Sequence, residues 1–120
     1  MTRAMRAAGV ADRALTLSLT DDKELRALNR QYAAEDHATD VLSFEQDAPL
    51  LGDVVISVET AARQAKAAKH SLGAELFHLA VHGMVHLVGY DHATKAEERV
   101  MFAYEAKLRA RATARPRRRA

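Results

Sequence analysis

The segment from residue 72 to residue 88, LGAELFHLAVHGMVHLV, constrains the fold of this chain more than any other. Its apolar residues are spread around much of a helical circumference, and a helix of that kind is normally buried inside a domain. Ser71 before the segment is a suitable N-cap, and Gly89 after it can adopt the left-handed conformation that ends many helices. We therefore predict a central, buried helix over residues 72–88.

Three short segments have the patterns of β-strands. Leu15, Leu17 and Leu19 alternate with small or polar residues, which predicts a half-buried strand over residues 14–20. Residues 41–45 and 52–57 are apolar and β-branched, and the connection QDAPLL between them allows the two strands to pair as a hairpin.

Three further helices complete the predicted order β-α-β-β-α-α-α. Thr20, Asp21 and Asp22 suit the N-cap and acidic first turn of one helix, and the Ala-rich residues 57–69 favour a second. Thr94 and Glu97 have the spacing of a capping box before the third, whose apolar stripe is formed by Val100, Met101, Tyr104 and Leu108. This order predicts an α/β (α+β) fold, in which about four to five helices cover a small mixed sheet of three to four strands.

Length and composition favour one domain in a reducing compartment. The chain has 120 residues, of which 48% are hydrophobic, and it has no Cys, so a transition-metal site would have to use His with Asp or Glu. No apolar run reaches the roughly 20 residues that span a bilayer, and we expect a soluble, cytoplasmic protein. We predict a domain over residues 1–110 and a basic, flexible tail over residues 111–120, which could either attract phosphate or simply be solvated.

Histidines near the end of the central helix suggest a metal site. His82 and His86 are four residues apart, so their Cβ atoms would lie about 6 Å apart on one helical face. His92 follows Gly89, and a turn at that glycine could return the third imidazole toward the other two. Three imidazoles leave the fourth position of a tetrahedral zinc open for water, as in catalytic sites. The alternative is a buried helix that happens to contain several histidines.

Neighbouring residues narrow these possibilities. His78 lies four residues before His82 and so continues the spacing of His82 and His86. We interpret it as a residue that contacts a metal ligand or packs in the core, and not as a ligand itself. Asp91 could orient a ligand histidine or cap the turn. Gly83 stands where a zinc protease of the H-E-x-x-H type has its catalytic Glu, which argues against peptide hydrolysis.

The motif HGMVHLVGYDH, residues 82–92, resembles the signature of the YbeY family of single-strand-specific metallo-endoribonucleases. Four further blocks are similar to the family's other motifs and come in the same order, so that the resemblance covers residues 14 to about 108. These blocks are LNRQY (28–32), TDVLSF (39–44), GDVVIS (52–57) and RQA (63–65).

The resemblance implies one zinc ion per chain, held by His82, His86 and His92 in a cleft beside the strand Thr39–Phe44. It also implies cleavage of single-stranded or ribosomal RNA, in 3′-end maturation of 16S rRNA and in ribosome quality control, with the small ribosomal subunit as a partner. The ion would either activate a water molecule or stabilise the charge that develops at the phosphodiester.

The sequence departs from the family pattern near the expected RNA path. Ala33 occupies a position where the family often has Arg, so Arg30 and Arg63 are candidate substitutes for contacts to phosphate. Ala38 and Glu45 stand where the family commonly has proline, and the N-terminal part is shorter than usual.

Two other functions fit the same residues. The loss of Arg at Ala33 and the basic tail favour a ribosome- or RNA-associated binding protein with a structural metal. The second function is that of a generic metallohydrolase acting on small substrates. It fits because most of the six aromatic residues are expected in the core, and the sequence shows no aromatic platform for RNA bases. The oligomeric state is not predicted.

Overall fold

The structure is a computed structural model that describes residues 1–33, 40–47, 49–89 and 94–113. Within these ranges, an N-terminal helix that the sequence did not predict precedes the predicted order of elements. The third strand begins at Leu50 rather than at residue 52. The elements are α1 (Thr2–Ala7), β1 (Ala14–Thr20), α2 (Asp22–Ala33), β2 (Val41–Glu45), β3 (Leu50–Ser57), α3 (Val58–Ala68), α4 (Leu72–Val88) and α5 (Lys95–Thr113).

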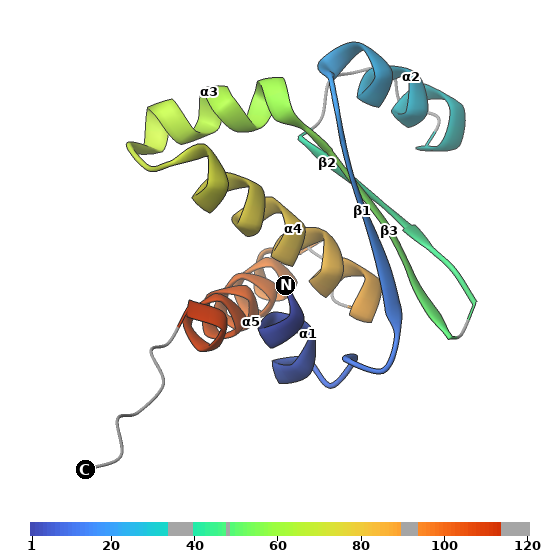
Figure 1. The fold of residues 1–120 in the computed structure, drawn as a ribbon, viewed down its shortest axis with the longest axis vertical. Helices are drawn as coiled ribbons and strands as arrows, with labels where there is room; N and C mark the ends of the chain where they lie inside the picture. Colours follow the sequence, from blue (N-terminus) through green and yellow to red (C-terminus); the bar gives the residue numbers. More distant parts are fainter. Residues whose placement is uncertain (34–39, 48, 90–93, 114–120) are drawn as a thin grey trace.

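The three described strands form a mixed sheet in the order β1-β3-β2. β1 runs parallel to β3, whereas β2 and β3 form the predicted antiparallel hairpin, so that Val54 of β3 lies between Leu17 and Ser43. Figure 1 shows α1, α3, α4 and α5 on one side of this sheet and α2 on the other. Among the described helices, none is long and apolar enough to cross a membrane.

The core lies between α4 and the sheet, which confirms the predicted central helix. Val54 and Ile56 of β3 are fully buried there, as are Met84 and Val85 of α4. α5 closes the core from the far side through Met101 and Leu108, and α1 packs on α5. The helix that carries the histidines is therefore fixed on two sides.

α4 begins and ends as the sequence predicts. The Ser71 hydroxyl accepts a hydrogen bond from the Ala74 amide at 3.1 Å, and Gly89 ends the helix with a φ of 122°. In α5, Thr94 accepts from the Glu97 amide at 3.1 Å, the N-cap half of the predicted capping box.

The beginning of α2 differs from the prediction in detail. Asp21, and not Thr20, caps the helix, because its carboxylate accepts the Glu24 amide at 2.8 Å. Thr20 is the last residue of β1, and its hydroxyl instead contacts the Glu24 side chain.

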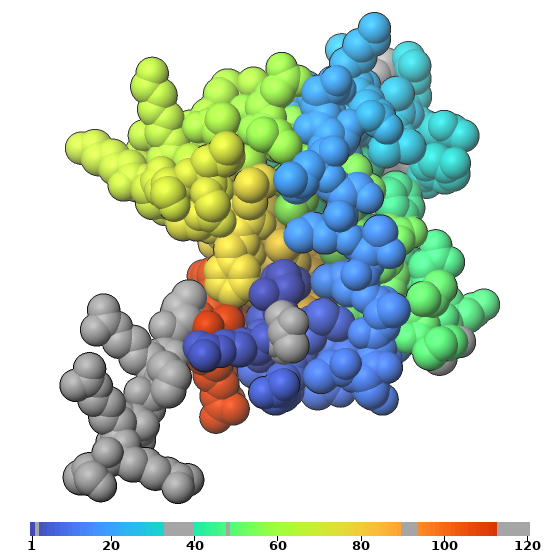
Figure 2. All heavy atoms as spheres, in the orientation of Figure 1, coloured from blue at the N-terminus to red at the C-terminus, as the bar shows by residue number. Residues whose placement is uncertain are grey.

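The prediction for β1 is wrong in its burial. Leu17 is 42% exposed and Leu19 is 54% exposed, although both project to the same side of the sheet as the buried Val54 and Ile56. β1 is an edge strand, and Figure 2 shows its residues at the surface along most of the strand. Alternation correctly indicated a strand there, but burial depends on neighbours that alternation does not specify.

α4 is in close contact with the sheet at Gly83. A Cβ atom at this position would lie 2.6 Å from Cγ1 of Val54 and 3.0 Å from the Ser43 hydroxyl. The same hydroxyl donates a hydrogen bond to the Gly83 carbonyl at 3.1 Å. Glycine therefore allows the backbone of the helix to contact β2 and β3.

We predict that Gly83→Ala lowers the free energy of unfolding by about 1–3 kcal/mol, because the added methyl group overpacks the contact with Val54. Gly73→Ala in the same helix is the matched control, since a Cβ there meets only the Ser71 hydroxyl at 4.0 Å. That variant should be unchanged or more stable by up to about 1 kcal/mol. Urea denaturation of both variants measures the difference, and equal stabilities would contradict the packing argument.

Candidate metal centre

His82 and His86 lie on successive turns in the C-terminal half of α4. His82 is partly buried and His86 is exposed, so the pair spans the boundary between the core and the surface. The third predicted ligand, His92, and the predicted orienting residue Asp91 lie outside the described residues. Over the ranges that the structure describes, no group of three or more His, Asp or Glu side chains is arranged to hold a metal ion.

A carboxylate from α5 fixes the ring of His82. Nδ1 of His82 lies 2.6 Å from Oε1 of Glu105, whose side chain is only 2% exposed. When the imidazole is neutral and Nδ1 carries the proton, the lone pair is on Nε2, the atom that can then bind a metal. Pairs of this kind fix both the tautomer and the orientation of ligand histidines. The His82 side chain therefore has the chemistry that a metal ligand requires.

Charged residues surround the His82–Glu105 pair. Glu105 also forms an ion pair with Arg109, whose Nη1 lies 3.8 Å from Oε2. The hydrogen bond to Glu105 raises the pKa of His82 above its usual value, against the effect of burial, and the charge of Asp40 acts in the same direction. Asp40, the residue before β2, is therefore close enough for its charge to act on His82.

His78 lies one turn before His82 and is partly buried. Burial lowers its pKa, and the nearby Arg109 guanidinium lowers it further, so the neutral imidazole is favoured. A role in orienting the ligands or in packing stays a prediction for this residue.

Sequence reasoning missed Glu105 because it followed only the apolar residues of α5. The buried side of this helix contains Met101, Glu105 and Leu108, whereas Val100 of the predicted stripe is 59% exposed. Glu105 is four residues after Met101 and three before Leu108, so helical spacing places it on their face. An acidic residue on an apolar face was the signal that could have identified it.

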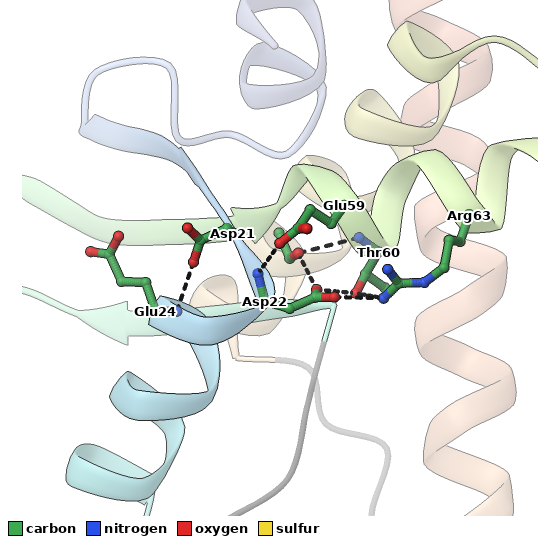
Figure 3. Close-up of polar contacts among 7 residues, drawn as sticks. Asp21, Asp22, Glu24, Glu59, Thr60 and Arg63 are labelled. Atoms are coloured by element: carbon green, nitrogen blue, oxygen red, sulfur yellow. Dashed lines mark hydrogen bonds and ion pairs between the residues drawn. The ribbon is translucent and has the colours of Figure 1, made fainter.

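Arg63, a predicted phosphate contact, takes part in a polar cluster at the start of α3 (Figure 3). Its Nη2 atom lies 2.7 Å from Oδ2 of Asp22 and also donates to the Thr60 hydroxyl at 2.8 Å. The hydroxyls of Ser57 and Thr60 donate to the other oxygen of Asp22. The guanidinium of Arg63 is therefore already paired with the Asp22 carboxylate. A phosphate would have to share this guanidinium with Asp22.

This cluster connects the first residues of α2 to those of α3. The Asp22 amide donates to the Glu59 carboxylate at 2.9 Å, as Figure 3 shows. Hydrogen bonds from Ser57, Thr60 and Arg63 lower the pKa of Asp22 from 3.8 to about 2. Arg30, the other predicted phosphate contact, is exposed on α2.

The fold and the site define a class: a small α/β protein whose central helix carries a histidine pair, one member of which is oriented by a buried carboxylate. Residues 2–113 match the model of the family described as Endoribonuclease YbeY. This chain belongs to that family, as the resemblance of residues 82–92 indicated.

Curated relatives named Endoribonuclease YbeY are similar over most of the chain. One from an Anaeromyxobacter species is 48% identical over 107 residues, which are 85% of this chain and 56% of the relative. One from Geobacillus kaustophilus is 45% identical, covering 81% of this chain and 71% of the relative. One from Aquifex aeolicus is 47% identical, covering 82% of this chain and 69% of the relative. The chain thus spans little more than half the length of the Anaeromyxobacter relative.

A protein from Thermotoga maritima whose structure was solved in solution has a similar fold. The TM-score is 0.57 at 22% sequence identity, and the match covers 97% of this chain and 85% of that one. The similarity supports the arrangement of helices around the sheet.

We predict that Glu105→Ala weakens binding of a divalent transition metal about 10- to 100-fold, because His82 loses the group that fixes its tautomer. Glu105→Gln should weaken it less, since an amide oxygen can still accept the Nδ1 proton. Competition of Zn²⁺ between the protein and a chromogenic chelator measures both affinities. Glu97→Gln, an exposed position of the same helix, is the control. Parent-like affinity of a folded Glu105→Ala variant would refute the orienting role.

The low pKa of Asp22 predicts a pH-dependent stability difference between the parent and Asp22→Asn. The folded carboxyl titrates at about 2 instead of 3.8, so its ionised form stabilises the fold fully above pH 3.8 and loses this effect as the pH falls toward 2. The parent should therefore be more stable than the variant near neutral pH, and this advantage should shrink between these two pH values.

Urea denaturation at a series of acidic pH values measures that change. Asp12→Asn, at an exposed position outside the cluster, is the control and should give a small difference that varies little with pH. A constant difference between the parent and Asp22→Asn would show that the ionised carboxylate is not what joins α2 to α3.

Proposed function

We propose that this chain is a metal-dependent endoribonuclease that cuts single-stranded RNA, in 3′-end maturation of 16S rRNA and in ribosome quality control. The observation that carries the proposal is the contact, at 2.6 Å, between His82 of the motif HGMVHLVGYDH and Glu105 of α5, in a chain that belongs to this family. The expected partner is the small ribosomal subunit, and the expected compartment is the cytoplasm.

One zinc ion per chain would be held by His82, His86 and His92. The donor set fits such an ion, because His82 is held with Nε2 as the ligand atom and His86 follows on the next turn of α4. Zinc bound there would supply positive charge, which makes water more acidic and stabilises the developing charge of a phosphodiester under attack. The choice of zinc over another divalent ion rests on the imidazole ligands.

The protein's own groups would keep this site in shape. Glu105 would hold the proton of His82 on Nδ1, and the ion pair with Arg109 would help to keep the Glu105 side chain in place. The hydrogen bond from Ser43 to the Gly83 carbonyl fixes the backbone between the two histidines against β2. These contacts would set the direction of the His82 imidazole before any substrate arrives, which reduces the reorganisation needed for catalysis.

Positioning of the RNA backbone would use cations outside the helix α4. Arg30 is exposed and available on α2, and Arg63 would contact phosphate while it remains close to Asp22. Ala33 provides no charge in this region. Contacts to phosphate from arginine are strong and often bidentate, so the loss of one should weaken backbone binding measurably.

The test is cleavage of a labelled single-stranded RNA by zinc-loaded protein, with the same RNA in a duplex for comparison. We expect His82→Ala and His86→Ala to reduce cleavage at least about 100-fold, because each removes a ligand of the metal that lowers the barrier. Their zinc content should fall in parallel. Lys66→Ala, at an exposed position on α3, is the control and should cut like the parent.

Two results would refute the proposal. One is a stoichiometrically zinc-loaded parent that leaves single-stranded RNA intact. The other is a His86→Ala variant that cuts as fast as the parent, which would assign the activity to another site or to a contaminant.

A further inference from the structure

A pocket of about 480 Å³ lies on the side of the sheet opposite α4, next to α2. α4 packs on the side that contains Val54, and successive residues of a strand project to opposite sides, so Asp53 and Val55 face the pocket. The volume is within the range of small-ligand sites. The proposed role of the histidine helix uses none of the side chains that line this pocket.

Two aromatic residues line the pocket. Tyr32 of α2 and Phe44 of β2 meet edge to face, with ring centroids 5.6 Å apart and an interplanar angle of 76°. Tyr32 is 63% exposed, so this ring is not part of the core. An exposed ring beside a pocket can stack on a planar ligand, and nucleobases stack on aromatic side chains whatever their identity.

The pocket also contains hydrogen-bonding groups that suit the edge of a base. Oδ2 of Asp53 accepts a hydrogen bond from Nε2 of Gln46 at 3.2 Å, and Ser18 contributes a hydroxyl. A carboxylate has about four acceptor positions, so one bond from Gln46 leaves capacity for a ligand. Guanine presents two adjacent donors, N1–H and the N2 amino group, which match the two oxygens of a carboxylate. Uracil presents a single donor on the corresponding edge.

Strand β2 connects the pocket to the histidine helix. Ser43 donates to the Gly83 carbonyl, between His82 and His86, whereas the next residue, Phe44, lines the pocket. The Cα atoms of these consecutive residues are about 3.8 Å apart. β2 is an edge strand of the described sheet, so a flexible chain can pass around it from one side to the other.

We propose that this pocket binds one unpaired base of a single-stranded RNA, with a preference for guanine, while the backbone passes around β2 toward the histidine helix. Tyr32 stacks on the base, Phe44 supports the Tyr32 ring through their edge-to-face contact, and Asp53 and Gln46 bind the edge of the base. The choice of RNA as the ligand rests on the proposed function. A base is favoured over a peptide, because the pocket combines the exposed face of one aromatic ring with the paired acceptor oxygens of a carboxylate.

The experiment measures binding of short RNA to the full-length, metal-loaded protein by fluorescence anisotropy. The probes are three 2′-O-methylated hexamers: one of uridine alone, one with a single guanosine, and one with an abasic position at the same place. Electrophoresis after each titration confirms that the probes remain intact. We expect the parent to bind the guanosine probe about tenfold tighter than the abasic probe, the size of one stacked base.

Variants assign this difference to the pocket. Tyr32→Ala should remove most of the tenfold difference without weakening the abasic probe, and Tyr32→Phe should retain it. Asp53→Asn should reduce the preference for guanosine over uridine. Phe102→Ala is the matched control, because Phe102 is another exposed ring, 48% exposed on α5, and its loss should change nothing.

Three results would overturn the inference: equal binding of the guanosine and abasic probes by the parent, parent-like base preference of Tyr32→Ala, or an equal loss in Phe102→Ala. A parent-like base preference of Tyr32→Ala would mean that the base binds outside this pocket, and a peptide or protein would then be the ligand to test there. Cleavage is scored separately. A parent that cuts RNA but shows no base preference keeps the proposed function and refutes the pocket, whereas base preference lost in Tyr32→Ala without cleavage supports the pocket alone.

Discussion

Backbone contact between α4 and the sheet at Gly83 determines where the candidate metal centre lies. Any side chain at this position would meet Val54 at a distance that real Cβ atoms do not tolerate. The hydrogen bond from Ser43 uses the same approach, because a hydroxyl on β2 reaches the helix carbonyl at 3.1 Å only when the two backbones are close. The imidazoles on either side of Gly83 are thus placed by backbone geometry, which is stiffer than side-chain packing.

A buried carboxylate then determines how the site is oriented. Removing Glu105 from water is costly unless both of its oxygens find partners, and they find His82 on α4 and Arg109 on α5. The site therefore depends on the packing of α5 against α4, which also buries Met101 and Leu108. Metal affinity and stability of the fold are coupled through this pair, since a loosened α5 would release the ring that binds the metal.

The sequence predicted the elements that local pattern controls. Apolar residues around the helix, with Ser71 and Gly89 at its ends, were sufficient to predict α4, and two apolar, β-branched runs were sufficient to predict the hairpin of β2 and β3. Burial of β1 and of Val100 could not be predicted, because it depends on which elements lie beside them. Helical spacing could have predicted that Glu105 is buried. It could not predict that His82 is its partner, because that contact depends on the angle at which α4 and α5 cross. His92 lies outside the described residues, so the complete ligand set stays a prediction.

Ala33 carries no charge at the position where the resemblance led us to expect Arg, and the residue before it in the sequence is the exposed Tyr32. Tyr32 lines a pocket with Asp53, whose negative charge would repel a phosphate but can accept the donors of a base. Contacts to phosphate weaken steeply with salt, whereas stacking on an aromatic ring does not depend on counterion release. The proposed base pocket would therefore depend more on stacking and on the edge of the base than on contacts to phosphate.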